Sequence, residues 1–264
     1  MRALLTAEFL RLRATRLWLW AFLAAVALGA GLVGLLGLIG PENAEPPMPG
    51  LSEPAGVSVV LGLFAITVFC PAIFGTAAMT SEFRHRTVVT TFLFAPRRWQ
   101  VLAAKLVIFA AGGLAYGVIS SGAALGALYL SAAITGTTVG VPLGSVLLTL
   151  VQISLAMAVY CLIGVGVGAL VRNQMIAMMI VIGYFYFDET MLMLIPGVNL
   201  LYPFLPGGAT AALTDFTFLT ESVSSELGTQ AVVLLPPALG AVVLLGYALA
   251  AAVAAVALPL RRDV

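Results

Sequence analysis

The sequence is dominated by long runs of apolar residues that contain almost no charge. An α-helix needs about 20 apolar residues to cross the hydrocarbon core of a bilayer. Only 9% of the residues are charged, whereas a soluble domain has about 25%. The composition excludes a soluble enzyme, a disordered chain and a nucleic-acid-binding protein, and it predicts an all-α membrane protein with one domain over residues 1–264. The six runs lie at residues 17–39, 57–81, 106–134, 141–171, 173–187 and 230–260.

The fifth run is too short for a simple crossing. As a helix it would span about 22 Å at 1.5 Å per residue, and Asp188 and Glu189 follow it. A second apolar piece at 191–205 contains Pro196 and Pro203, which prevent a continuous helix. We therefore expect six transmembrane helices, with an extracytoplasmic re-entrant hairpin within residues 188–229, between helices five and six.

The positions of the charged residues orient these helices. The twelve Lys and Arg residues all lie at 2–16, 84–105, 172 and 261–262, which six crossings would place on one side of the membrane. The opposite loops contain acidic residues but no basic ones. The positive-inside rule then predicts that both termini are cytoplasmic. A different number of crossings would scatter the arginines over both faces, so this partition also supports the count.

Residues 1–16 combine apolar residues with four arginines. The pattern predicts an amphipathic helix in the membrane interface. Two interpretations remain open: the segment is a basic flank that only sets the topology, or it is an elbow helix that joins the membrane domain to a cytoplasmic partner.

Residues 82–105 form the longest loop on the basic side, with charges at both ends and an apolar middle. A loop that only set the topology would not need Val88, Phe92 and Phe94 so close together, because such a surface requires a groove to bury it. Pro96 separates this middle part from the helix that enters the third crossing. The segment is therefore expected to contain a short helix lying across the membrane plane.

This loop resembles that of the membrane subunits of type-two ABC (ATP-binding-cassette) exporters. In that family it reads roughly Glu–aromatic–Arg–x–Gly–Thr, then a Thr/Leu stretch, then Pro–x–Arg and a Lys before the third crossing. Arg86 stands where the family usually has Gly. Six crossings, an N-terminal amphipathic helix and an outer re-entrant element are similar too. The matching residues are Glu82, Phe83, Arg84, Thr87, Thr91, Leu93, Pro96, Arg98 and Lys105.

The resemblance implies that residues 82–105 form a coupling helix that docks in a groove of a separate ATPase subunit. Apolar anchors would dominate the affinity, and charges would set the register. The alternative is a basic loop that binds anionic lipid. The residues expected to couple to the ATPase are Glu82, Phe83, Arg84, Val88, Phe92, Phe94, Arg97 and Arg98.

The chain itself is not expected to be an enzyme. It has no P-loop motif, and Lys105 is its only lysine, so ATP and Mg²⁺ would be bound by the partner ATPase. No cofactor or metal is expected, since His85 is the only histidine. A second permease protomer, identical or homologous, would be needed to enclose a path across a bacterial inner membrane.

Few polar residues interrupt the apolar runs, and four residues are candidates for a substrate path: Gln152, Met178, Asp188 and Glu189. Gln152 either bridges two helices or touches substrate. The acidic pair is either a solvated helix end or an acidic mouth that attracts a cation. Met178 belongs to a group of methionines that form either an adaptable wall or plain filler.

Three Gly-x-x-x-Gly motifs permit close helix approach and suggest a tight bundle, with a dimer seam as a further option. They begin at Gly113, Gly122 and Gly164.

The near-absence of charge within the crossings argues against an ion or a sugar as substrate. The expected function is therefore export of a hydrophobic compound, such as a lipid, drug or natural product. The alternative is a passive channel or a membrane scaffold without an ATPase partner. An intramembrane protease is disfavoured, because the only histidine falls on the basic side and no Gly-x-Ser-x-Gly occurs.

Overall fold

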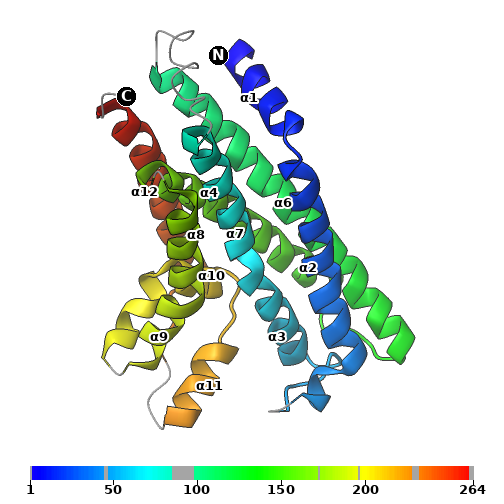
Figure 1. The fold of residues 1–264 in the computed structure, drawn as a ribbon. Helices are drawn as coiled ribbons and strands as arrows, with labels where there is room; N and C mark the ends of the chain where they lie inside the picture. The colour runs from blue at the N-terminus through cyan, green and yellow to red at the C-terminus, as the bar shows by residue number, and fades with distance from the viewer. Residues whose placement is uncertain are drawn as a thin grey trace.

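The computed structural model describes residues 2–44, 47–84, 98–171, 173–195, 197–227 and 232–261. Every regular element within those residues is helical (Figure 1), which confirms the predicted all-α class. Among the described residues, five helices are long and apolar enough to cross a membrane: Leu17–Ile39, Pro54–Ser81, Ala103–Thr135, Leu143–Leu170 and Pro237–Ala255.

The chain begins with two helices joined by a bend. Helix α1 spans Arg2–Ala14 and α2 spans Leu17–Ile39. The Thr15 hydroxyl donates to the carbonyl of Leu12 (2.8 Å) at the end of α1. A short 3₁₀ turn at Pro41–Asn43 follows α2. The bend lets α1 take a direction different from that of α2 (Figure 1).

The second crossing consists of α3 (Pro54–Ala65), a 3₁₀ turn at Ile66–Val68 and α4 (Phe69–Arg84). Pro71 explains the irregular turn, because its nitrogen carries no hydrogen and its ring clashes with the carbonyl four residues earlier. The Thr67 hydroxyl turns back to donate to the carbonyl of Phe64 (2.8 Å). The crossing thus remains helical along its length.

Helices α6 (Arg98–Thr135) and α7 (Leu143–Leu170) form the centre of the bundle. With 38 residues, α6 is about 57 Å long at 1.5 Å per residue, so it extends well beyond a hydrocarbon core of about 30 Å. Helix α7 packs against α4, α6 and α12, and α2 packs mainly on α6.

The sequence predicts that the helix after α7 ends before Asp188 and Glu189. In the structure it continues through both residues. Asn173 caps α8 (Gln174–Ile182), a π-helical segment at Gly183–Asp188 continues it, and α9 (Glu189–Leu194) follows directly. The backbone stays helical across both junctions. The physical reason is that the carboxylate of Glu189 has hydrogen-bonding partners inside the protein, as described below.

Three short elements and a final long helix complete the chain. These are a 3₁₀ segment at Val198–Phe204, α10 (Pro206–Leu213), α11 (Phe218–Leu227) and α12 (Pro237–Arg261). Residues 232–236 are not helical, so α12 starts later than the apolar run at 230–260, because a proline favours the first position of a helix. Helix α10 lies closer to the middle of the bundle than α11 does (Figure 1).

Two of the three Gly-x-x-x-Gly motifs lie at helix crossings. A Cβ atom on Gly113 would lie 2.6 Å from Cβ of Cys161, and one on Gly164 would lie 2.0 Å from the carbonyl oxygen of Ala72. By contrast, a Cβ atom on Gly122 or Gly126 would meet nothing within 4 Å. The motif at Gly113 therefore packs α6 against α7, and the motif at Gly164 packs α7 against α4. The motif at Gly122 lies on an uncovered face of α6.

Polar side chains reinforce these crossings. The Thr76 hydroxyl lies 2.9 Å from the carbonyl oxygen of Gly164, and the hydroxyls of Ser121 and Ser154 are 3.0 Å apart. Hydroxyls of this kind contribute about 0.6 kcal/mol each inside a membrane protein.

We predict that Gly164→Val destabilises the protein by about 1–3 kcal/mol, because the added methyl groups must displace backbone atoms of α4. Thermal unfolding of the purified protein in detergent measures the effect. The matched control is Gly126→Val on the uncovered face of α6, which should unfold within one or two degrees of the native protein. Equal losses for the two variants would contradict the packing described here.

Candidate coupling site and outer acidic site

Three helix ends lie at the end of the bundle where both termini are found: α1, the C-terminal end of α4 and the N-terminal end of α6 (Figure 1). Helix α4 ends at Arg84 and α6 begins at Arg98, so these helices carry the predicted docking segment between them. Four of its expected contact residues lie outside the described residues: Val88, Phe92, Phe94 and Arg97.

The remaining expected contact residues lie on α4 and α6. Arg84 is exposed in the last turn of α4, where a cation is favoured by the helix dipole. Phe83 is half-buried and packs against a core cluster that includes Met79 and Phe109. Its ring therefore contributes to the chain's own core. Glu82 and Arg98 lie within the helices, but their side chains are outside the described part of the structure.

A buried ion pair fastens α1 to α6 close to this segment. Lys105 Nζ lies 3.0 Å from Glu8 Oε2, and the two side chains are only 3% and 6% exposed. Arg11 Nη1 lies 3.1 Å from the other carboxylate oxygen of Glu8. The ammonium group of Lys105 also lies 5.8 Å from the ring centroid of Phe109. Two cations of this cluster thus contact the one carboxylate of Glu8.

The energetic consequence is that α1 and the start of α6 must stay together. A buried charge that loses its partner costs about 3–5 kcal/mol. Sequence reasoning missed this contact, because Glu8 and Lys105 lie 97 residues apart. A signal was present: Lys105 is the only lysine of the chain, and Glu8 is the only acid among the first 41 residues.

At the opposite end, Glu189 is buried and joins two elements. Its side chain is 4% exposed, and Oε1 accepts hydrogen bonds from the backbone N–H groups of Gly207 (2.5 Å) and Gly208 (3.3 Å) at the start of α10. A carboxylate is stabilised there by the unpaired N–H groups and the helix dipole. Glu189 is therefore not part of a solvated helix end, which was one of its two sequence interpretations.

A small cavity of about 150 Å³ adjoins this carboxylate. Tyr160 and Thr210 face each other on its wall, with 3.3 Å between their hydroxyl oxygens. Tyr202 also lines the cavity. Burial raises the pKa of its phenol above the usual range, and the nearby Glu189 carboxylate adds a smaller increase. The Tyr202 hydroxyl therefore stays neutral. Sequence reasoning singled out Glu189 but missed the residues that surround it.

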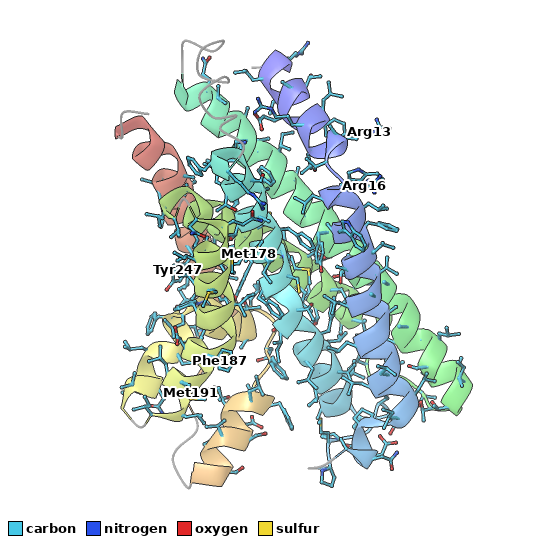
Figure 2. All side chains as sticks on the ribbon, in the orientation of Figure 1. Arg13, Arg16, Met178, Phe187, Met191 and Tyr247 are labelled. Carbon is cyan, nitrogen blue, oxygen red and sulfur yellow. The ribbon has the colours of Figure 1, made fainter. Side chains whose placement is uncertain are left out.

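The other candidates for a substrate path are not brought together with Glu189. Asp188 is exposed, and Met178 is half-buried on α8. Gln152 is half-exposed on α7, and within the described residues its amide has no hydrogen-bond partner. Figure 2 shows Met178 on α8, well above Met191 and Phe187 near α9. The methionines thus do not form one wall around the acidic pair.

Comparison with known protein families decides what kind of protein this is. A family model described as ABC-2 family transporter protein matches residues 4–188, more than two thirds of the chain. The chain belongs to the ABC-2 transporter family. A comparison with curated proteins gives no match.

Membership in the ABC-2 family confirms the resemblance seen in the sequence and identifies the chain as a membrane component of an ABC transporter. The match begins within α1 and includes the whole segment between α4 and α6. It ends at residue 188, so Glu189 and the elements that follow lie outside it.

We predict that Lys105→Met and Glu8→Gln each lower the free energy of unfolding by about 3 kcal/mol, since each breaks the buried contact between these two side chains. The double variant should lose clearly less than the sum, because the buried charges are removed together. Denaturant unfolding in detergent completes this cycle. Glu221→Gln, at an exposed position, is the control and should change stability by less than about 0.5 kcal/mol. If the losses of the two single variants simply added up in the double variant, the proposed contact between Glu8 and Lys105 would be contradicted.

A second stability prediction concerns the outer site. Glu189→Leu leaves two N–H groups of α10 without an acceptor and should cost about 2–4 kcal/mol. The neighbouring Asp188→Leu changes an exposed side chain and should be close to neutral. Limited proteolysis of the region after residue 194, together with thermal unfolding, compares the two. A larger loss for Asp188→Leu would disprove the capping role.

Proposed function

We propose that this chain is the membrane subunit of an ATP-driven exporter of a hydrophobic compound, such as a lipid, drug or natural product. A separate ATPase subunit would bind ATP and Mg²⁺ and dock on residues 82–105. The observation that carries the proposal is the family match, because it includes the whole of that segment. A second permease protomer, identical or homologous, would complete the transport path.

The proposed topology has six crossings, with both termini in the cytoplasm of a bacterial cell and the bundle in its inner membrane. The helical run from Gln174 to Leu194 supports one more crossing beyond the five long apolar helices, since it is about 30 Å long at 1.5 Å per residue. An even number of crossings agrees with the position of both termini at one end of the bundle (Figure 1). The basic residues of α1 and of the ends of α4 and α6 support a cytoplasmic location for that end.

We propose that the elements between α9 and α12 form a re-entrant cover on the outer side. The position of α10 nearer the middle of the bundle supports this (Figure 1). The bonds of Glu189 to Gly207 and Gly208, and that of the Tyr247 hydroxyl to the carbonyl of Phe204 (3.1 Å), hold the cover to α9 and α12.

The coupling step would pass from the docking segment into the bundle through two helices. Residues 85–97 lie between α4 and α6 in the chain, and the Glu8–Lys105 pair links α6 to α1. A displacement of the docking segment would therefore move α4, α6 and α1 relative to the lipid. In this mechanism Phe92 and Phe94 anchor the segment in the ATPase groove, and Arg84, Arg97 and Arg98 steer it.

The substrate path would use a face of the bundle that one protomer leaves open. Gln152 is half-exposed beside the exposed side chains of Leu148, Val151 and Leu155. An amide without a partner is costly in hydrocarbon, so we propose that Gln152 faces the path enclosed with the second protomer.

We predict that Phe92→Asp abolishes ATP turnover by the complex, because a charge cannot enter an apolar groove without a large desolvation cost. The conservative control, Phe92→Leu, should retain at least a third of the turnover. The measurement is ATP hydrolysis by the co-purified complex in proteoliposomes, with membrane insertion checked separately. Unchanged turnover in Phe92→Asp would reject the docking role, and a native chain that captures no ATPase would favour the channel or scaffold.

A further inference from the structure

The carboxylate of Glu189 is buried without a cation to balance it. Its side chain is 4% exposed, and its hydrogen-bond donors are the N–H groups of Gly207 and Gly208, which both reach Oε1. Within the described part of the chain, no basic side chain pairs with Glu189 and no group donates to Oε2. A buried carboxylate normally has a charged partner in addition to such dipoles.

The sequence offers no counter-cation near this carboxylate either. Between residues 106 and 260 the only basic residue is Arg172, which precedes α8, whereas Glu189 begins α9. The basic residues of α1, α4 and α6 belong to the end of the bundle that carries the termini, and α9 lies at the other end (Figure 1). A balancing positive charge is therefore expected from a bound molecule.

The cavity of about 150 Å³ beside Glu189 has a wall rich in aromatic rings. Two of these rings, those of Tyr160 and Phe185, lie with their centroids 4.8 Å apart. An aromatic face attracts a cation within about 6 Å of its centroid, most strongly where water is excluded. A carboxylate beside an aromatic wall therefore suits a substituted ammonium group. The aromatic residues of the wall are Phe69, Tyr160, Phe185, Tyr202 and Phe216.

The same wall is poorly suited to a bare metal ion. Calcium takes about six to eight oxygen ligands, and magnesium takes about six in a strict octahedral arrangement. The described residues contain no group of three His, Cys, Asp or Glu side chains that could hold a metal. Much of the wall is aliphatic carbon, including Ala65, Val68 and Ala211. One carboxylate among carbon surfaces favours an organic cation.

The size and place of the cavity limit what can occupy it. A volume of about 150 Å³ is below the range of about 300–1,000 Å³ for pockets that enclose drug-sized ligands, so the cavity would take a head group and leave the rest of the molecule outside. Its walls come from α3, α7 and α9 and from the outer elements α10 and α11. Glu189, Tyr202 and Thr210 lie beyond residue 188, where the family match ends, so the match does not supply this site.

We propose that this cavity binds the positively charged head group of a hydrophobic amine on the outer side of the transport path, and that such amines are the exported substrates. The ammonium group would lie beside Oε2 of Glu189 and against the rings of Tyr160 and Tyr202. The apolar remainder would extend from the cavity along the path. The inference rests on the proposed function, since it names the substrate class of the exporter and its last binding site before release.

Two pairs of variants separate this role from a purely structural one. Glu189→Gln removes the negative charge but keeps an oxygen that can accept from Gly207 and Gly208. Its matched control is Asp188→Asn, which removes the same charge from the exposed neighbour. Tyr202→Leu removes an aromatic ring from the wall, whereas Tyr202→Phe keeps the ring.

The experiment measures binding of tritiated phenyltrimethylammonium to the purified full chain in detergent by scintillation proximity, and binding should saturate. Glu189→Gln should weaken it roughly tenfold or more, because the cation loses a buried charge partner, and Asp188→Asn should leave it within about twofold. Tyr202→Leu should weaken binding about threefold or more, and Tyr202→Phe should stay within about twofold. tert-Butylbenzene, the neutral molecule of the same shape, should compete at least about tenfold less well than the unlabelled probe.

Several results would overturn the proposal. Binding that never saturates, or that is equal in Glu189→Gln and the native chain, would exclude a site at the carboxylate. Equal losses in Asp188→Asn and Glu189→Gln would reveal only a long-range attraction. Equal competition by tert-butylbenzene would reject a cation, and displacement by sodium chloride at about 1 mM, too dilute to screen charges, would identify an inorganic ion as the occupant. If Glu189→Gln does not fold, the Tyr202 pair and the neutral competitor decide the question.

The binding measurement needs no ATPase, so it is independent of the proposed function. A chain that binds no phenyltrimethylammonium, in a complex whose ATP turnover is lost in Phe92→Asp, would overturn the cavity and leave the exporter. Saturable binding in a chain whose Phe92→Asp variant keeps full turnover would uphold the cavity and reject the docking role. Saturable binding without ATP-dependent transport of the probe in proteoliposomes would refute the assignment of amines as substrates.

Discussion

The bilayer interior offers no water, so each polar group that this chain places there needs a partner within the protein. The partners found are specific. Thr76 reaches the backbone of α7, Ser121 reaches Ser154, and the carboxylate of Glu189 takes two N–H groups of α10. At the basic end the same requirement joins Glu8 to Lys105. The arrangement of helices around α7 follows from satisfying these few groups while the glycines bring the backbones together.

Against that background, one polar group on the surface of α7 that lacks a partner is informative. The amide of Gln152 is half-exposed and has no hydrogen-bond partner among the described residues. An amide without a partner is costly in hydrocarbon. In the function that we propose, Gln152 faces the transport path. Glu189, in contrast, accepts two backbone N–H groups through Oε1 and holds the outer elements together.

Much of the fold could be predicted from the sequence, because long charge-free runs have few alternatives to membrane helices. The errors fell where a distant residue decided the outcome. The helix at residues 174–194 continues past Asp188 because the N–H groups of Gly207 and Gly208 donate hydrogen bonds to Glu189, and no local pattern contains that information. The three glycine motifs look alike in sequence, yet Gly122 and Gly126 pack against nothing, since a motif does not reveal which helix will face it. The pairing of Glu8 with Lys105 was hidden in the same way by its separation along the chain.

The contrast between tight and loose contacts suggests how a push at the docking segment would act in the proposed mechanism. Glycine crossings hold α7 against both α4 and α6, and the buried ion pair holds α1 against α6, so these helices resist separation. The contact between α2 and α4 is marginal, and a cavity lies between them. A rigid group that is displaced deforms at its weakest boundary. Movement of α4 and α6 by the docking segment would therefore change the width of the cavity between α2 and α4, so this boundary is where nucleotide chemistry would deform the bundle first.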